Sequence, residues 1–388
     1  MVNISKDILK RSKDLIELRR NFHKIPELYF QEFDTSKLLQ KLLDEKGIEY
    51  KVIAKTGLVL TIGEDKSKNA IMFRADMDAL AILEENTFDY CSTNDGAMHA
   101  CGHDAHMAIL LTTIFWLKEN ESKLKKAVKF VFQPAEEKSG GAKVMIDEGV
   151  MLNPKVSQVF GLHIANRLKS NVLGIKKGIA SSYCDEFQVK IIGKGGHGAR
   201  PYQCVEPIML ATKFITECQL MMARDLSALD SAVMTFTSIH SGKSFNVIDD
   251  VCDLGGTLRT LSLDSRDLII NNINKKVKAY ELEYDCKINF DLIEGYPAIL
   301  NDDKSCDVII NTSKEIVGDK NIIEDGLGMG GEDVAFFLQE APGCYFLLGC
   351  GGDSLDYSPH HNSTFDFDES SLITGVAIFT NVIKKLGM

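Results

Sequence analysis

The sequence predicts an α/β protein of two domains, one of which is built from two separated pieces of the chain. Three observations support this prediction. With 388 residues, the chain exceeds the usual length of one domain. The segments before residue 180 and after residue 294 alternate helices with short apolar strands. Residues 181–293 instead follow a β-α-β-β-α-β order.

The N-terminal part of the chain combines an amphipathic helix with strands that are apolar on both faces. The predicted helix carries apolar residues on one side, at Ile4, Ile8, Leu15 and Phe22. The predicted strands are AIMF (70–73), AVKFVFQ (127–133) and VFGLHI (159–164). Strands without a polar face, separated by helical segments, are typical of a mixed or parallel sheet covered by helices.

The middle of the chain changes its pattern near Tyr183. A strand, EFQVKIIG, is followed by the loop GKGGHGARP and by a helix that begins near Glu206 and Pro207. Two strands (AVMTFTSI and VCDLGGTLRTL), a charged helix (264–283) and a last strand (CKINFDLI) complete the order β-α-β-β-α-β. We therefore assign 181–293 to an inserted domain.

After the insertion the α/β pattern returns. It consists of a helix after Asn301, a strand CYFLLG (344–349) and a final helix (369–385). Residues 1–180 and 294–388 are therefore predicted to form one domain together.

Composition and charge exclude several classes of protein. Hydrophobic residues make up 45% and charged residues 26%, as in globular proteins. The net charge of −11 disfavours nucleic acid as a partner, and no apolar stretch has the length of a membrane span or a signal peptide. Ten cysteines scattered through a long chain indicate a reducing compartment. We therefore expect a cytoplasmic protein without a membrane anchor.

Metal-ligating residue types gather in short segments at the ends of the predicted strands. MHACGHDAHM contains Cys101, His103 and Asp104, while His163 ends the strand VFGLHI and His361 lies in a loop before the last helix. Thiolate and imidazole together suit zinc and related divalent metals. Because sites in α/β sheets form beyond the carboxyl ends of strands, we expect these residues to lie together.

Two adjacent glutamates, Glu136 and Glu137, follow the strand 127–133. One can bind a metal while the other takes a proton from water as a general base. Asp76 and Asp78, which follow the preceding strand, either support the metal-binding side chains or are turn residues.

The ordered set of motifs resembles the metal-dependent N-acyl-amino-acid amidohydrolases. These include hippurate hydrolase, bacterial aminoacylases, N-acetyldiaminopimelate deacetylase and the plant hydrolases of indoleacetyl-amino-acid conjugates, within the aminoacylase and carboxypeptidase superfamily. The resemblance rests on RRNFHKIPEL, RADMDAL, MHACGHDAH, FQPAEE, GLHI, GKGGHGARP, FNVID, MGGEDVAFFL and HHNSTFDFDE, which span almost the whole chain.

The resemblance implies two divalent metal ions per subunit, either zinc, manganese, nickel or cobalt. Cys101 would be shared by both ions, His103 and His163 would bind one, and Glu137 and His361 the other. By the same resemblance, Glu136 would be the general base and the proton donor to the leaving amine. Asp104, like Asp76, would support the ligands.

The resemblance also implies a phosphorylase/hydrolase-like catalytic domain and a ferredoxin-like lid and dimerisation domain. In the lid, His197 would polarise the scissile carbonyl, reaching a site in the partner subunit of a homodimer or homotetramer. Asn246, Arg259 and Gly330 would contact the substrate.

The function that we expect is hydrolysis of the amide bond of small N-acyl amino acids. Two divalent ions against one thiolate and one carboxylate leave about two positive charges, which favours an anionic substrate. An N-acetyldiaminopimelate deacetylase and a metallo-carboxypeptidase or dipeptidase are the nearest alternatives. A cysteine-nucleophile amidase leaves the glutamates and His163 unexplained, and a non-catalytic metal-binding protein is expected to lack one of these groups.

Overall fold

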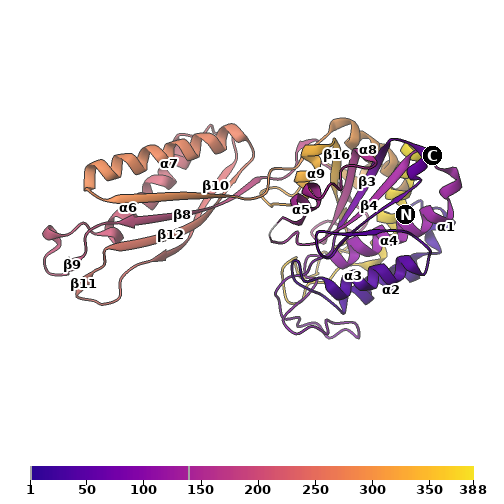
Figure 1. Cartoon of the computed structure of the whole chain (residues 1–388), viewed down its shortest axis with the longest axis horizontal. Coiled ribbons are helices and arrows are strands. Elements are labelled where there is room, and N and C mark those ends of the chain that lie inside the picture. The colour runs from indigo at the N-terminus through magenta and orange to yellow at the C-terminus, as the bar shows by residue number, and fades with distance from the viewer. Residues whose placement is uncertain (1, 139) are drawn as a thin grey trace. The chain divides into compact units, whose positions relative to one another are not determined.

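The computed structural model, which describes residues 2–138 and 140–388, folds into two units, each built around a sheet of its own (Figure 1). The first unit contains Met1–Ala180, Ile299–Gly326 and Glu332–Met388. The second contains Ser181–Ala298 and Leu327–Gly331. The α/β class predicted from the sequence is confirmed.

The first unit contains an eight-stranded mixed sheet with the order β1-β2-β4-β3-β5-β16-β6-β15. Its central strands β4, β3, β5 and β16 are parallel neighbours. The strands are β1 (Lys51–Ile53), β2 (Gly57–Ile62), β3 (Asn69–Asp76), β4 (Ala127–Gln133), β5 (Lys155–Ala165), β6 (Leu173–Gly174), β15 (Ile322–Ile323) and β16 (Gly343–Gly349). A separate two-stranded ribbon joins β7 (Gly178–Ile179) to β14 (Leu300–Asn301).

Helices cover both faces of this sheet. They are α1 (Lys6–Leu9), α2 (Ser12–His23), α3 (Phe33–Asp44), α4 (His103–Glu119), α5 (Gly141–Asp147), α8 (Asp303–Val317), α9 (Val334–Glu340) and α10 (Leu372–Gly387). Side chains of successive strand residues point to opposite faces. Phe73 of β3 contacts Phe379 of α10, whereas the next residue, Arg74, reaches Asp333 at the start of α9. Helices α10 and α9 therefore lie on opposite faces of the sheet.

The N-terminal helix predicted from the sequence is interrupted. It ends at Leu9 and resumes at Ser12, whose hydroxyl donates to the Leu9 carbonyl oxygen. Its apolar side is nevertheless buried as predicted, at Ile4, Ile8, Leu15 and Phe22.

The second unit contains a four-stranded antiparallel sheet with the order β10-β12-β8-β13. Helices α6 and α7 contact each other and these strands, and lie side by side along one face (Figure 1). The elements are β8 (Tyr183–Ile192), β9 (Gly196–His197), α6 (Pro207–Arg224), β10 (Ala232–His240), β11 (Val247–Ile248), β12 (Val251–Thr260), α7 (Leu263–Tyr284) and β13 (Lys287–Glu294). Apart from the small β9–β11 ribbon, the order is β-α-β-β-α-β.

Two short segments that we assigned to the first domain lie in the second unit instead. They are 294–298 and 327–331. The physical reason is hydrogen bonding along the start of β8, where the Cys184 amide donates to the Tyr296 carbonyl and the Ser182 amide to the Gly330 carbonyl.

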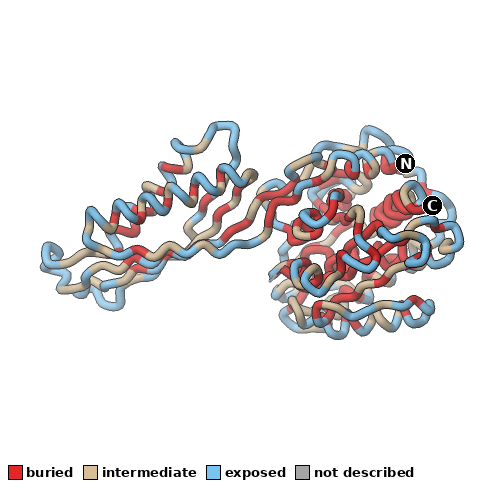
Figure 2. Tube along the Cα trace, turned by 45° about the horizontal axis from the view of Figure 1, so that its top comes forward, coloured by how far each residue is buried: buried red, intermediate tan, exposed pale blue. Residues whose placement is uncertain are grey.

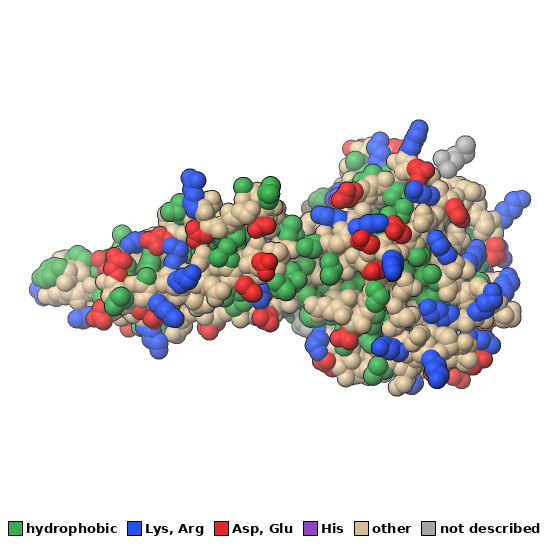
Figure 3. Space-filling model, turned by 90° about the horizontal axis from the view of Figure 1, so that it is seen from above, with side chains coloured by type: hydrophobic (Ala, Val, Ile, Leu, Met, Phe, Trp, Pro, Cys, Tyr) green, Lys and Arg blue, Asp and Glu red, His purple; other side chains and the backbone are tan. Residues whose placement is uncertain are grey.

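Each unit has its own apolar core (Figure 2). In the first, buried side chains of the central strands, such as Phe73, Phe130 and Phe160, stack between the helices. Among the described residues, no helix is long and apolar enough to cross a membrane. On the faces seen in Figure 3, basic and acidic side chains are interspersed over both units.

Candidate metal centre

The predicted metal-binding side chains of the first unit meet where its parallel strands end. Strand β3 ends at Asp76 and pairs there with Gln133, the last residue of β4. Glu136 and Glu137 are the third and fourth residues after the end of β4. His163 lies near the end of β5. Because these strands are parallel, their carboxyl ends share one edge of the sheet, as the sequence predicted.

Cys101 and His103 reach this edge from the start of α4. Between them, Gly102 has a φ of +89°, and a Cβ atom at this residue would lie 2.4 Å from Ile164 Cδ1. Glycine is therefore required for α4 to begin so close to β5.

The structure brings these donors together in two overlapping groups. Ligand atoms of Cys101, His103 and His163 lie within 4.8 Å of one another, and so do those of Cys101, Glu137 and His361. In the first group the Cys101 sulfur is 3.4 Å from His163 Nε2. In the second, His361 Nε2 is 3.5 Å from Glu137 Oε1, which is itself 3.8 Å from His103 Nε2. Cys101 belongs to both groups.

Hydrogen bonds to the backbone fix which imidazole nitrogen faces the centre. The Nδ1–H of His103 donates to the Asp78 carbonyl oxygen at 2.9 Å, and the Nδ1–H of His163 donates to the Ile164 carbonyl oxygen at 2.6 Å. A carbonyl oxygen can only accept, so the proton is on Nδ1 and the Nε2 lone pair is available to a metal.

Two atoms at this centre are buried without a hydrogen-bond partner among the described residues, His103 Nε2 and Glu137 Oε1. Buried polar atoms are normally paired, and an unpaired lone pair suits a bound cation. With thiol, imidazole and carboxylate donors converging, the residues present fit a divalent metal pair.

Charge at the centre also favours cations. Although burial opposes the charged form, the carboxylates of Asp76, Asp78 and Glu137 raise the pKa of His103 to about 10. Burial raises the pKa of the Cys101 thiol well above its usual value, and the charges of Glu137 and Glu136 add to this. In the absence of metal, these groups hold protons that a metal displaces on binding.

Glu136 lies among other buried carboxylates. Its carboxylate is within 4.8 Å of those of Glu332 and Asp333. Burial, together with the negative charges of Glu332 and Glu137, raises the pKa of Glu136 well above its usual value. A carboxyl group whose pKa lies nearer to neutral is suited to general acid and base catalysis.

One guanidinium balances this cluster. Arg74, fully buried, lies 2.6 Å from Asp76 and 3.0 Å from both Glu332 and Asp333, and its Nε donates to Gln133. The sequence analysis did not identify Arg74, Glu332 or Asp333 as functional. Their place in RADMDAL and MGGEDVAFFL was the only available signal.

The aspartates expected to support the ligands differ in their contacts. Asp76 lies 3.9 Å from His103 Nε2 and accepts from His106 Nδ1 at 2.6 Å, while His106 Nε2 accepts from the Ile164 amide. The Asp104 carboxylate contacts Arg19 and His23. Asp78 contacts both His103 and Glu137, whose amide donates to its carboxylate at 3.0 Å.

The remaining predicted residues lie in the second unit. His197 and Asn246 are neighbours on the β9–β11 ribbon, where the Gly198 amide donates to the Asn246 carbonyl. Both side chains are exposed. Arg259 is half-buried on β12 and donates to the Asp185 and Leu258 carbonyls, and Gly330 is exposed.

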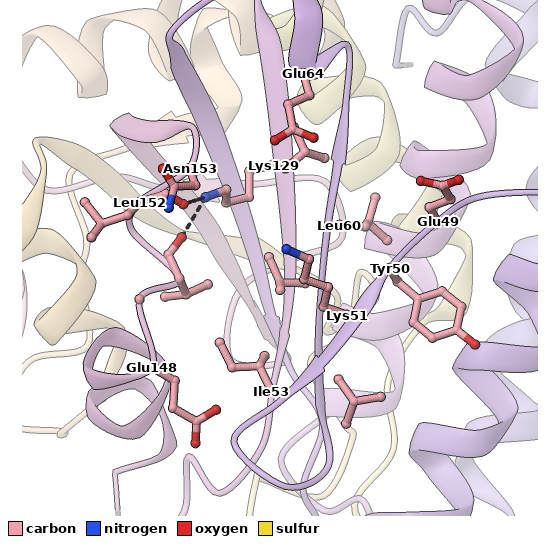
Figure 4. Close-up of a pocket in the computed structure, with 15 residues that line it drawn as sticks. Glu49, Tyr50, Lys51, Ile53, Leu60, Glu64, Lys129, Glu148, Leu152 and Asn153 are labelled. Carbon is pink, nitrogen blue, oxygen red and sulfur yellow. Dashed lines mark hydrogen bonds between the residues drawn. The ribbon is translucent and has the colours of Figure 1, made fainter.

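A cavity of about 420 Å³ beside β1 and β2 is separate from these donors (Figure 4). At its wall, the Lys129 ammonium donates to the carbonyl oxygens of Val150, Leu152 and Pro154 at 2.7–3.0 Å. An ammonium has three N–H donors, so Lys129 has none left for a ligand.

Comparisons with known proteins agree with this geometry. The model of peptidase family M20/M25/M40 matches residues 72–385. N-acetyl-L-cysteine deacetylase of Bacillus subtilis (strain 168) is 34% identical, over 96% of this chain and 88% of that protein. Thermostable carboxypeptidase 2 of Saccharolobus solfataricus is also 34% identical, over 97% and 96%.

Among solved structures, the YXEP protein of Bacillus subtilis is described as a dinuclear metal binding peptidase from the M20 family. It is 29% identical, with a TM-score of 0.84 over 97% of this chain and 98% of that one. The fold therefore has a counterpart in a protein that is described as binding two metals.

Proposed function

The chain belongs to peptidase family M20/M25/M40 and is a metal-dependent hydrolase of amide bonds, and on this premise we propose that it releases the acyl group from N-acyl amino acids. The observation that carries the proposal is that Cys101 belongs to two donor groups beside the buried carboxylate of Glu136. The likeness to an N-acetyl-L-cysteine deacetylase supports this substrate class.

The ligands follow from the two groups. In this proposal His103 and His163 would hold one ion, Glu137 and His361 would hold the other, and Cys101 would serve both. Zinc, manganese, nickel and cobalt all suit a mixed sulfur, nitrogen and oxygen donor set. Bound ions of this kind polarise a carbonyl and lower the pKa of water.

The chain's own residues perform the proton transfers. Glu136 takes a proton from the attacking water and passes it to the departing amide nitrogen. Burial and the negative charges of Glu332 and Glu137 raise the pKa of Glu136 well above its usual value, which favours the second transfer. His197 donates a hydrogen bond to the developing oxyanion.

The second unit serves as lid and dimerisation domain in this proposal. Arg259, which donates only to carbonyl oxygens in the contacts described, binds the carboxylate of the substrate in this proposal. Gly330 and Asn246, which lies near His197 on the β9–β11 ribbon, also contact the substrate. The active form is a homodimer in which His197 acts on the partner's site. Sedimentation of an active monomer would contradict this assembly.

A cytoplasmic location is part of the proposal. All ten cysteines are free thiols, including Cys306 and Cys344, whose sulfurs lie only 3.4 Å apart. Thiols persist in this form in a reducing compartment.

A second candidate substrate is a peptide with a free carboxyl terminus, because the chain is equally similar to a carboxypeptidase. A panel of hippurate, N-acetyl amino acids, N-acetyldiaminopimelate and dipeptides decides between them. We expect the highest kcat/KM on an acyl amino acid, and a preference for dipeptides would contradict the proposal.

The role of Glu136 is tested in the same assay. Glu136→Gln should lower kcat by about 10³-fold while the metal content stays unchanged. Glu340→Gln, an exposed glutamate on α9, is the matched control and should retain full activity. Removal of the metals by a chelator should abolish turnover, whereas thiol alkylation of the holoenzyme should not. A mechanism in which Cys101 is the nucleophile predicts the opposite results.

A further inference from the structure

A buried glutamate outside the metal centre contacts the loop that carries Glu136 and Glu137. Glu32, at 0% exposure, precedes α3. Its Oε1 accepts the Ala135 amide at 3.0 Å and the Phe30 amide at 2.9 Å, and its Oε2 accepts the Thr56 hydroxyl at 2.6 Å. Ala135 is the residue immediately before Glu136.

Both backbone donors to Glu32 have a left-handed conformation. The φ of Ala135 is +54° and that of Phe30 is +54°. Such a φ is uncommon for a residue with a side chain and persists where surrounding contacts enforce it. The Glu32 carboxylate accepts a hydrogen bond from the amide of each of these residues.

The same loop is restrained from two further sides. The Gly141 amide donates to the Ala135 carbonyl at 3.1 Å, and a Cβ atom at Gly141 would lie 1.8 Å from the Pro134 oxygen. A Cβ atom at Gly57, next to Thr56, would lie 2.8 Å from Pro134 Cδ. The Thr56 turn therefore packs directly on the residue that precedes Ala135, and Glu32 joins the two.

We propose that Glu32 is a positioning residue that sets the direction of Glu136 and Glu137 by holding the Ala135 amide. This inference rests on the proposed function, in which Glu136 transfers protons. The backbone torsions of Ala135 determine where the next two side chains point, and a displacement of about 1 Å at a catalytic group costs on the order of 10²-fold in rate. Glu32 itself touches neither substrate nor metal ligands.

The role depends on shape more than on charge. Burial raises the pKa of Glu32 to about 7, in spite of the hydroxyl of Thr56 and the backbone amides. A protonated carboxyl keeps every contact if its O–H donates to Thr56 while Oε1 still accepts both amides. Glutamine has the same shape, an oxygen that accepts both amides and an NH2 group that donates to Thr56, whereas aspartate keeps the charge but is one methylene shorter.

The test compares Glu32→Gln with Glu32→Asp. Glu32→Asp should lower kcat on the order of 10²-fold with KM within about threefold, and speed hydrogen exchange in the segment 133–137. Glu32→Gln should keep both near wild type. Glu27→Asp is the matched control, because Glu27 accepts the Asp34 and Thr35 amides in the same region and does not contact the loop.

Three results would overturn the proposal. The first is unchanged kcat and hydrogen exchange in Glu32→Asp, and the second is an equal loss in Glu32→Gln, which would make charge the important property. A loss in Glu27→Asp as large as that in Glu32→Asp would also overturn it, as a general effect of destabilisation. If the wild type cleaves nothing on the substrate panel, the proposed function fails, while hydrogen exchange still decides whether Glu32 holds this loop.

Discussion

Replacing Arg74 by methionine should destabilise the first unit strongly, because it removes the one guanidinium within a buried carboxylate cluster. The Arg74 side chain is 0% exposed, 2.6 Å from Asp76 and 3.0 Å from Glu332 and Asp333. Removing one partner of a buried ion pair costs about 3–5 kcal/mol, since the other charge stays buried without compensation.

The number of partners places the expected loss within this range. Glu332 loses its counter-charge, whereas Asp76 keeps His106 at 2.6 Å and His103 at 3.9 Å, so the expected loss lies in the middle of the range. Burial, opposed by Arg74, raises the pKa of Asp333 to about 8, so this third carboxyl holds a proton at pH 7 and adds little. We therefore expect a loss of about 4 kcal/mol in the free energy of unfolding.

The assay is urea unfolding at pH 7, followed by the fluorescence of Trp116. This is the single tryptophan of the chain, 2% exposed in the core of the first unit. Arg167→Met is the matched control, because Arg167 pairs with Asp325 while 53% exposed, and such pairs contribute about 0–1 kcal/mol. Equal losses in the two variants would refute the reasoning.

Three further predictions follow from the same contacts. His361→Ala should reduce the bound metal to about one ion per chain. His360→Ala should keep both ions, because His360 Nε2 donates to a carbonyl oxygen instead. Metal analysis after dialysis measures this, and equal metal contents in the two variants would contradict the prediction. The pKa of Glu32 is raised to about 7 in the folded protein, so the folded state keeps this proton to a higher pH than the unfolded state does. The free energy of unfolding of the wild type should therefore fall by up to about 3 kcal/mol between about pH 4.5 and 7. Urea unfolding of Glu32→Gln across this range should lack the decline. Lys129→Met leaves two buried carbonyls and one part-buried carbonyl without this donor and should cost about 3 kcal/mol in thermal unfolding. The exposed Lys143→Met should have no measurable effect.

Local pattern was sufficient for the main elements of the fold. The apolar runs predicted as strands correspond to β3, β4, β5 and β16. Strands that are apolar on both faces are buried in the middle of a sheet that helices cover on both sides. The sequence did not predict the interruption of the first helix at Leu9, nor that 327–331 belongs to the second unit. Both features depend on hydrogen bonds and packing that no local pattern encodes.

The donor residues were recognisable in the same way. Cys101, His103, Glu136 and Glu137 stand in short motifs, and parallel strands carry such motifs to one edge of a sheet. Motif position did not identify which aspartate orients them. Asp76 and Asp78 both lie near His103, and Asp78 also contacts Glu137, whereas Asp104 contacts Arg19 and His23 instead.

The identity of the donors and the α/β architecture can therefore be derived from residue types and periodicity alone, since both depend on short-range order along the chain. Three features cannot be derived in this way: the nitrogen of each histidine that carries the proton, the balance of charge around Glu136, and the hydrogen bond from the Ala135 amide to Glu32. Glu32 and Ala135 are 103 residues apart, and Arg74 and Asp333 are 259 apart. Contacts over such separations exist only once the sheet has assembled and burial has removed the water that would otherwise pair with these groups.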